Sequence, residues 1–254
     1  MNRSKIHWLD GGSIPEGCLI MEAVPGVGNV GKIMIDALIS KHPSRTIGWI
    51  LHPDFPPHAT LGEKGLIGPP RLEVSTIVLP DGKTIVGITG IMQPMTASGQ
   101  YEVAETILDL AKQCMAPQLL VLAGLASGPD CRAIHAICSS EEVRRKLEGS
   151  DIIVSRDQPQ QGMIGMAGLV LSLSATEEVP AVGVVAETIG ASSDVLAADR
   201  MANWIEQAFE VPLDLDLDST KETAARLMKE IGVESSIEDY LTFDEQETSS
   251  DFYV

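Results

Sequence analysis

The seven residues from Gly26 to Lys32 have the types and the spacing that bind phosphate groups. Gly26, Gly28 and Gly31 fit the G-x-G-x-x-G pattern of dinucleotide sites, and the whole run fits the G-x-x-x-x-G-K pattern of phosphate loops. Both kinds of site use backbone N–H groups that glycines leave accessible, beside a helix N-terminus that favours anions. This stretch therefore raises the question of whether the chain binds a nucleotide.

Each pattern lacks a part of its full site. A phosphate loop needs Ser or Thr after the lysine to hold magnesium, and the residue there is Ile33. A dinucleotide site needs an acidic residue at the end of the next strand, but that strand, Thr46 to Leu51, runs into a proline-rich stretch. We therefore interpret the turn as structural, with glycines that permit positive φ angles and close packing of a helix on a sheet. The alternative is an anion site formed by Gly26, Gly28, Gly31 and Lys32.

The charge balance of the chain excludes two classes of partner. Its 254 residues include 36 acidic and 18 basic ones, which gives a formal net charge of −18. Nucleic acids and anionic membranes are bound through clusters of Lys and Arg, so we expect neither as a partner. Four cysteines without a C-x-x-C pair indicate reduced thiols, and no apolar signal-peptide region follows Met1. We therefore expect a cytoplasmic protein.

Two groups of residues have the side chains of metal ligands but too few of them for a site. One group is His52, Asp54 and His58 in the proline-rich stretch, and the other is Cys131, His135 and Cys138. A closed zinc site needs four ligands at characteristic spacings, which neither group provides. We expect no metal and no cofactor.

Strands that alternate with helices through most of the chain predict an α/β fold with a layered, largely parallel sheet. The clearest local signal is an antiparallel hairpin, in which Arg71 to Leu79 and Lys83 to Ile91 flank a Pro-Asp-Gly turn. Apolar spacing predicts amphipathic helices from about Ser98 and over Asp194 to Phe209. The run from Gly162 to Thr176 is apolar nearly all round, which predicts a helix buried in the core or against a subunit.

The chain is expected to form one α/β domain over residues 1–232, with its core at 17–212 and a last helix at 219–231. Within that core, Asp151 to Val154 is predicted as a further strand. Residues 233–254 are acidic and polar, yet they end in Phe252, Tyr253 and Val254. Apolar side chains at an acidic terminus have no role in folding, so this ending favours insertion into a pocket of a partner.

Four blocks of the sequence together resemble the archaeal and eukaryotic proteasome-assembly chaperones. They cover most of the chain in a fixed order: Glu22 to Lys32 (EAVPGVGNVGK), Gly90 to Ala111 with Tyr101-Glu102, Gly162 to Leu169 (GMIGMAGL), and Pro180 to Thr188 (PAVGVVAET). The resemblance implies an α/β/α sandwich similar to nucleoside phosphorylases, with a mostly parallel sheet and without established catalysis. It also implies that the glycine-rich turn is a structural signature.

Members of this family assemble as oligomers, and several end in a hydrophobic–tyrosine–any tripeptide that docks between subunits of the proteasome α-ring. Phe252, Tyr253 and Val254 match that pattern. The resemblance therefore implies an archaeal, non-enzymatic homologue that forms homo-oligomers and binds the α-ring. Two alternatives stay open: an enzyme that binds a nucleotide or nucleoside at the glycine-rich turn, and an assembly module that binds only a paralogue of the same family.

Overall fold

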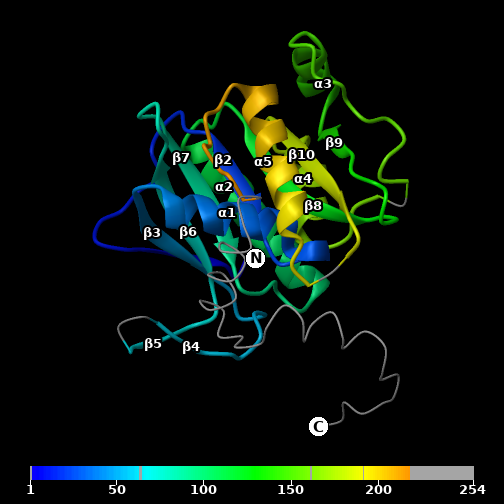
Figure 1. Cartoon of the computed structure of the whole chain (residues 1–254). Coiled ribbons are helices and arrows are strands. Elements are labelled where there is room, and N and C mark those ends of the chain that lie inside the picture. Colours follow the sequence, from blue (N-terminus) through cyan, green and yellow to red (C-terminus); the bar gives the residue numbers. More distant parts are fainter. Residues whose placement is uncertain (1, 63–64, 161, 191, 218–254) are drawn as a thin grey trace, which may run out of the picture. The chain divides into compact units, whose positions relative to one another are not determined.

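Ten strands and five helices form in the part of the chain that the computed structural model describes, residues 2–62, 65–160, 162–190 and 192–217 (Figure 1). The strands are β1 (Lys5–Trp8), β2 (Ile20–Ala23), β3 (Ser44–Leu51), β4 (Thr60–Leu61), β5 (Ile67–Gly68), β6 (Leu72–Val78), β7 (Thr84–Gly90), β8 (Leu119–Ala126), β9 (Ile134–Cys138) and β10 (Ala181–Thr188). The helices are α1 (Val30–Lys41), α2 (Ala97–Gln113), α3 (Glu141–Glu148), α4 (Met166–Ser174) and α5 (Val195–Phe209). A 3₁₀ turn, Val27–Asn29, leads into α1.

Eight strands form one sheet in the order β1-β3-β6-β7-β2-β8-β10-β9. The four central strands, β7, β2, β8 and β10, are parallel to one another. The other pairings are antiparallel, so β3 runs in the direction of the central four while β1, β6 and β9 run against them. This confirms the predicted α/β class, the largely parallel sheet and the β6–β7 hairpin. The antiparallel part also includes β1, β3 and β9, which pair with β3, β6 and β10 respectively.

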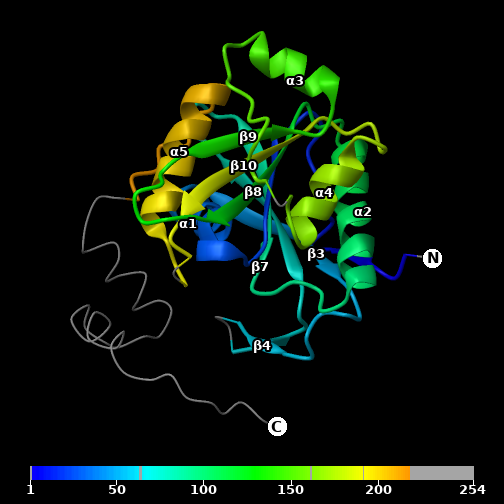
Figure 2. The ribbon, with the colours of Figure 1, turned by 90° about the vertical axis from the view of Figure 1, so that its right-hand side faces the viewer.

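Helices cover both faces of the sheet, which makes a three-layer α/β/α arrangement (Figure 2). Helices α1 and α5 pack together on one face, and α2 and α4 pack together on the other. Each pair closes a core of fully buried apolar side chains. They include Met34, Leu38, Met201 and Ile205 on the first face, and Val103, Ile107, Met166 and Val170 on the second.

Three helices begin at the side-chain caps that their sequences offer. The hydroxyl of Thr96 accepts from the Gly99 N–H at the start of α2, and Asp194 accepts from Ala197 at the start of α5. Ser140 does the same for α3. Such caps satisfy N–H groups that have no partner within the helix, which is why the predicted starts of α2 and α5 are correct to within a few residues.

Two elements differ from their predictions. Helix α4 begins at Met166, later than predicted, because Gly162 and Gly165 have φ angles of +72° and +86°, outside the helical region. The segment Asp151 to Val154 is not a strand: it forms only an isolated bridge, from Val154 to Ala136 in β9. Ile153 is 88% exposed, so the apolar residues of this segment do not mark a strand that is buried in the sheet.

The chain up to Leu217 belongs to one compact unit. Its last described residues alternate leucine and aspartate, and Leu213, Leu215 and Leu217 are buried in the core of the α1 and α5 face. The predicted helix at 219–231 and the acidic segment at 233–254 lie outside the described residues, as do Phe252, Tyr253 and Val254.

Candidate functional site

The carboxyl ends of the parallel strands meet at one edge of the sheet, which is where open α/β sheets bind their ligands. Five stretches of the connections along this edge contain no Asp, Glu, Lys, Arg or His: residues 24–29, 91–99, 123–129, 158–165 and 188–193. Charged residues stand elsewhere in the same connections, among them Asp130, Arg156 and Asp194, and the β3–β6 connection at this edge contains His52 and Asp54. We call the five stretches together the uncharged edge. The connections at the opposite edge carry charges, among them Asp10, Glu16, Asp81, Lys83, Glu177 and Glu178.

The glycine-rich turn lies in the uncharged edge and packs directly on β8. Gly28 has a φ angle of +65°, which glycine adopts without strain. A Cβ at Gly31 would lie 2.6 Å from the Cβ of Leu122, and a Cβ at Gly124 would lie 2.1 Å from the carbonyl oxygen of Val27. Glycines at these positions therefore let α1 and its turn approach β8 more closely than any other residue would.

The same turn is tied to the loop between β10 and α5. The Asp194 N–H donates to the Gly28 carbonyl oxygen over 2.9 Å, and the Asn29 side chain donates to the Ser192 carbonyl oxygen over 2.7 Å. Thr188, at the end of β10, donates its hydroxyl proton to Asp194 Oδ2 over 2.6 Å. The polar groups of the turn are thus used to hold two connections of the uncharged edge together.

Lys32 does not face the turn as a phosphate-binding lysine would. Its ammonium group is paired with Asp36, one helical turn further along α1. Burial raises the pKa of the Asp36 carboxyl, and the neighbouring Lys32 opposes that effect. Ile33 is half-buried and packs against the core of the α1 and α5 face. An anion at the turn would therefore meet main-chain N–H groups without the lysine.

Gln93, in the connection after β7, links two other connections of the uncharged edge. Its amide NH₂ donates to the carbonyl oxygen of Pro25, just before the glycine-rich turn. Its amide oxygen accepts from the N–H of Met166, 3.3 Å away, at the start of α4. One side chain thus joins the ends of β2 and β7 to the N-terminus of α4, which makes these loops one continuous surface.

A cavity of about 520 Å³ opens on this surface beside the turn. Its lining combines apolar side chains with uncharged polar groups and one carboxylate, and includes Val27, Ser127, Gln158, Met163, Ile164 and Glu187. None of the described residues that line it is Lys or Arg. Without a cation, the cavity does not suit a phosphate or another anionic ligand.

The carboxylate of Glu187 braces the loops around this cavity. It accepts from the Ala133 N–H over 2.9 Å and contacts His135 Nε2 at 3.3 Å. Burial acts to raise the pKa of Glu187, but these hydrogen bonds outweigh it and hold the pKa below its usual value. The other ring nitrogen of His135 contacts the Ser155 hydroxyl at 3.0 Å. Ser155, His135 and Glu187 therefore form a hydrogen-bonded chain across β9 and β10.

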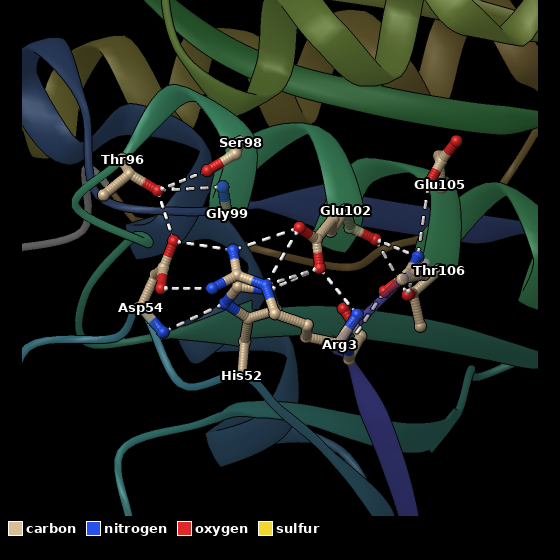
Figure 3. Close-up of polar contacts among 11 residues, drawn as sticks. Arg3, His52, Asp54, Thr96, Ser98, Gly99, Glu102, Glu105 and Thr106 are labelled. Atoms are coloured by element: carbon tan, nitrogen blue, oxygen red, sulfur yellow. Dashed lines mark hydrogen bonds and ion pairs between the residues drawn. The ribbon is translucent and has the colours of Figure 1, made fainter.

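A charged cluster lies beside the uncharged edge, where β3 ends and α2 begins (Figure 3). The guanidinium group of Arg3 contacts carboxylate oxygens of both Asp54 and Glu102 at 3.0 Å. The buried ring of His52 receives the Asp54 N–H on Nδ1, so its Nε2 carries the proton and donates to Glu102 over 3.1 Å. Thr96 caps α2 and also hydrogen-bonds to Asp54.

This cluster fixes the N-terminal residues against α2. Hydrogen bonds from Arg3, and a weaker one from His52, lower the pKa of Glu102 to about 2. Hydrogen bonds from Thr96 and Arg3 lower the pKa of Asp54 as well. Both carboxylates are thus ionised and already paired within the chain, so the cluster ties the N-terminal residues to the start of α2. Among the described residues, no group of three or more His, Cys, Asp or Glu has an arrangement that could hold a metal ion.

Glu22 is the most unusual titratable residue of the sheet. It lies on the central strand β2, opposite Ile88 and Val121, and is fully buried. Neither of its carboxylate oxygens has a hydrogen-bond partner within the described residues. Burial raises the pKa of this carboxyl to about 8, so at neutral pH it is largely protonated.

Comparison with known proteins identifies the family. Residues 20–232 match the PAC2 family. The chain belongs to the PAC2 family. This confirms the resemblance to proteasome-assembly chaperones that the four sequence blocks show. A relative, the uncharacterized protein MJ1210 of Methanocaldococcus jannaschii, is 28% identical over 185 residues, which are 72% of this chain and 70% of the relative.

Solved structures share the fold of this PAC2 protein. PbaB of Pyrococcus furiosus, an archaeal proteasome activator, superposes with a TM-score of 0.75 at 17% identity over 91% of this chain and 98% of PbaB. PbaA of the same organism, a homologue of proteasome-assembly chaperones, gives 0.71 at 21% identity over 90% of this chain and 94% of PbaA. Rv2125 of Mycobacterium tuberculosis, a proteasome-assembly chaperone homologue, gives 0.64 at 16% identity over 88% of this chain and 99% of Rv2125.

Sequence reasoning placed the glycine-rich turn correctly at a strand-to-helix junction, but it missed most of its surroundings. Gln93, Thr188 and Asp194 bind the connections together, and they lie far from the turn in sequence. The lack of charge in the five stretches is visible in the sequence, but their position at one edge of the sheet is known only from the topology. No helix of the described residues is long and apolar enough to cross a membrane.

Proposed function

We propose that this chain is a cytoplasmic, homo-oligomeric, non-enzymatic homologue of the proteasome-assembly chaperones. It docks on the proteasome α-ring through Phe252, Tyr253 and Val254. The observation that carries the proposal is membership of the PAC2 family over residues 20–232, on a fold shared with PbaB and PbaA. The hydrophobic–tyrosine–any tripeptide of Phe252, Tyr253 and Val254, in a chain that belongs to this family, supports the α-ring as the partner.

In this mechanism the protein binds and does no covalent chemistry. Phe252 fills an apolar pocket between α-subunits, Tyr253 packs and donates a hydrogen bond, and the Val254 carboxylate pairs with a lysine of the pocket. The acidic residues of segment 233–251 steer the tripeptide toward a basic site. One tripeptide has a small contact area, so several tails on one homo-oligomer are needed to give avidity.

The site geometry favours binding over nucleotide chemistry. Lys32 is paired with Asp36, Ile33 offers no hydroxyl for magnesium, and the adjacent cavity has no Lys or Arg among its described lining residues. If the chain were a nucleotide-binding enzyme, saturating nucleotide would raise its melting temperature, and Lys32→Ala would remove that increase. We expect no shift of the melting temperature with any nucleoside or nucleotide, and a shift of that kind would replace this proposal with the enzyme alternative.

The Ser155–His135–Glu187 chain has the hydrogen-bond order of a hydrolase triad, so it needs a direct test. Glu187 also holds the Ala133 N–H, which favours a role as a brace between β9 and β10. We expect no labelling of Ser155 by a fluorophosphonate probe. Labelling that Ser155→Ala abolishes would assign acyl-transfer chemistry to this protein.

The experiment that tests the proposal is binding of the full-length protein to an immobilised archaeal proteasome core particle, compared with a variant lacking Phe252–Val254. Binding by the full-length protein that the deletion abolishes, with no change in oligomer size, supports α-ring docking. Binding that survives the deletion contradicts it. Stable complex formation with a co-purified paralogue instead of the α-ring would favour the assembly-module alternative.

A further inference from the structure

Two of the four cysteines lie side by side in the fold, although they are far apart in the sequence. Cys18 precedes β2, and Cys114 is the C-cap of α2. Helix α2 leads through a short connection into β8, which is a parallel neighbour of β2. Parallel strands begin at the same edge of their sheet, so the end of α2 and the start of β2 meet at that edge.

Main-chain and side-chain contacts join the two residues. The N–H of Gly17 donates to the Cys114 carbonyl oxygen over 2.6 Å, which fixes the chain before Cys18 against the end of α2. The two thiol groups interact directly as hydrogen-bond partners. Both are free thiols in this structure. A disulfide needs two cysteines whose side chains point toward each other at short range, and this pair meets that condition.

The other two cysteines are not placed to form a pair. Cys131 is exposed in the connection between β8 and β9, and Cys138 is the last residue of β9. From Ala133, which still bonds to Glu187 of β10, the strand rises about 16 Å to Cys138. Cys131 is two residues before Ala133 and can recover only about 7 Å of that distance. A disulfide needs Cα atoms closer than about 7 Å, so these two thiols do not meet.

We propose that Cys18 and Cys114 form a disulfide when the chain meets a small-molecule disulfide such as oxidised glutathione, and that this bond clamps the start of β2 to the end of α2. The thiolate of one cysteine attacks a sulfur of the oxidant, which gives a mixed disulfide and releases one small thiol. The other cysteine attacks the protein sulfur of that mixed disulfide and releases the second small thiol. Two electrons pass from the cysteine pair to the oxidant, and the two cysteine protons end on the released thiols.

Burial decides when this exchange takes place. Cys18 is 6% exposed and Cys114 is 1% exposed, and burial raises the pKa of both thiols. Because the thiolate is the reacting form, the folded, reduced protein should exchange slowly. The bond therefore forms fastest while the chain folds, before the two residues are covered. The completed fold then shields it from reductants.

The bond acts mainly on the unfolded chain. It closes a loop of about 100 residues, which contains α1, α2 and the strands β2 to β7. Closing a loop of that length removes conformational entropy from the unfolded state, whereas the folded chain already holds the two thiols together. We therefore expect the disulfide to raise the melting temperature by more than about 5 °C.

The test is refolding of the full-length protein from guanidinium, either in a mixture of reduced and oxidised glutathione or in dithiothreitol. The product is unfolded again without reductant, its free thiols are alkylated with iodoacetamide, and its peptides are analysed by mass spectrometry. We expect a linked Cys18–Cys114 peptide after refolding in glutathione. The double variant Cys131→Ser, Cys138→Ser is the matched control and should retain that peptide, whereas Cys18→Ala should lose it.

Thermal melts measure the clamp itself. The double variant refolded in glutathione should melt more than about 5 °C above the same protein refolded in dithiothreitol, and Cys18→Ala should melt at one temperature after both treatments. Cys18 and Cys114 found alkylated, or each bearing glutathione, in the wild type would overturn the proposal. A linked peptide that contains Cys131 or Cys138 in its place would do the same, and equal melting temperatures of the double variant would overturn the clamp.

The wild-type peptide analysis needs no substitution, so it decides the proposal even where Cys18→Ala does not fold. The experiment contains no proteasome, so its outcome is independent of α-ring docking.

Discussion

Gly31 of α1 lies so close to Leu122 of β8 that a Cβ at position 31 would be 2.6 Å from the Leu122 Cβ. Glycine inside a helix costs about 1 kcal/mol relative to alanine. Its presence in the first turn of α1 is therefore explained by the contact and not by helix formation. This approach holds the glycine-rich turn on β8.

Replacing that glycine should destabilise the fold. We expect Gly31→Ala to lower the free energy of unfolding by about 1–3 kcal/mol, because the clash with β8 exceeds the gain in helix propensity. Gly26→Ala is the control: Gly26 has an extended backbone, and its nearest neighbour to a Cβ is 3.9 Å away, so the change should stay within about 0.5 kcal/mol. Urea unfolding followed by tryptophan fluorescence measures both. Equal losses would contradict the packing role.

Glu22 should make stability depend on pH. Its pKa is raised from about 4.5 to about 8 by burial, so the unfolded chain ionises before the folded one. Its contribution to stability is therefore complete below pH 4.5, falls as the pH rises toward 8, and is constant above that. We expect Glu22→Gln, which has nearly the same shape without a charge, to exceed the wild type in unfolding free energy at pH 8 by more than it does at pH 5. A difference between the two proteins that does not vary over this range would rule out a buried, titrating Glu22.

The Arg3 cluster should show the opposite dependence. The pKa values of Asp54 and Glu102 are lowered in the folded chain, so their contribution is present above about pH 4.5 and is lost as the pH falls toward 2. We expect Arg3→Met to lower the melting temperature at pH 7, with a difference that shrinks on acidification or in high salt. Arg45→Met, which removes an exposed pair with Asp10 at 3.8 Å, is the control and should have little effect. A deficit for Arg3→Met that is unchanged at low pH would contradict the electrostatic clamp.

The four cysteines should differ in reactivity. Cys131 is exposed, whereas Cys18 and Cys114 are buried, and burial raises the pKa of the Cys18 thiol to about 12. At pH 8 we expect one fast phase with Ellman's reagent, which Cys131→Ser removes. Cys18 and Cys114 should react only after unfolding in guanidinium. Rapid modification of more than two thiols in the native protein would contradict the burial of Cys18 and Cys114.

Elements with local signals could be predicted from the sequence. The Pro-Asp-Gly turn defines the β6–β7 hairpin within three residues, and Asp194 marks the start of α5 by capping it. The start of α4 was predicted too early for a local reason as well. Gly162 and Gly165 have positive φ angles, which hydrophobic periodicity does not reveal. Asp151 to Val154 has the composition of a strand, but the pairing partner that would make it one is absent apart from a single bridge.

Relationships between distant segments could not be predicted. Arg3 and Glu102 are 99 residues apart, and nothing near either one indicates the other. The strand order places β2 between β7 and β8, which also depends on long-range pairing. The five uncharged stretches can each be found in the sequence, but only the topology places them at one edge of the sheet. The glycine-rich turn could be interpreted from the sequence alone, because the hydroxyl that a phosphate loop needs is missing at Ile33, next to the turn.

We propose that this PAC2 protein docks on the proteasome through its C-terminal tripeptide. The most direct measurement is the affinity of the full-length chain and of Tyr253→Ala for a purified archaeal core particle, with Tyr101→Ala, an exposed tyrosine on α2, as the matched control. We expect Tyr253→Ala to abolish binding and Tyr101→Ala to retain it. Equal binding by the wild type and Tyr253→Ala, or no binding by any of the three proteins, would refute docking through the tripeptide.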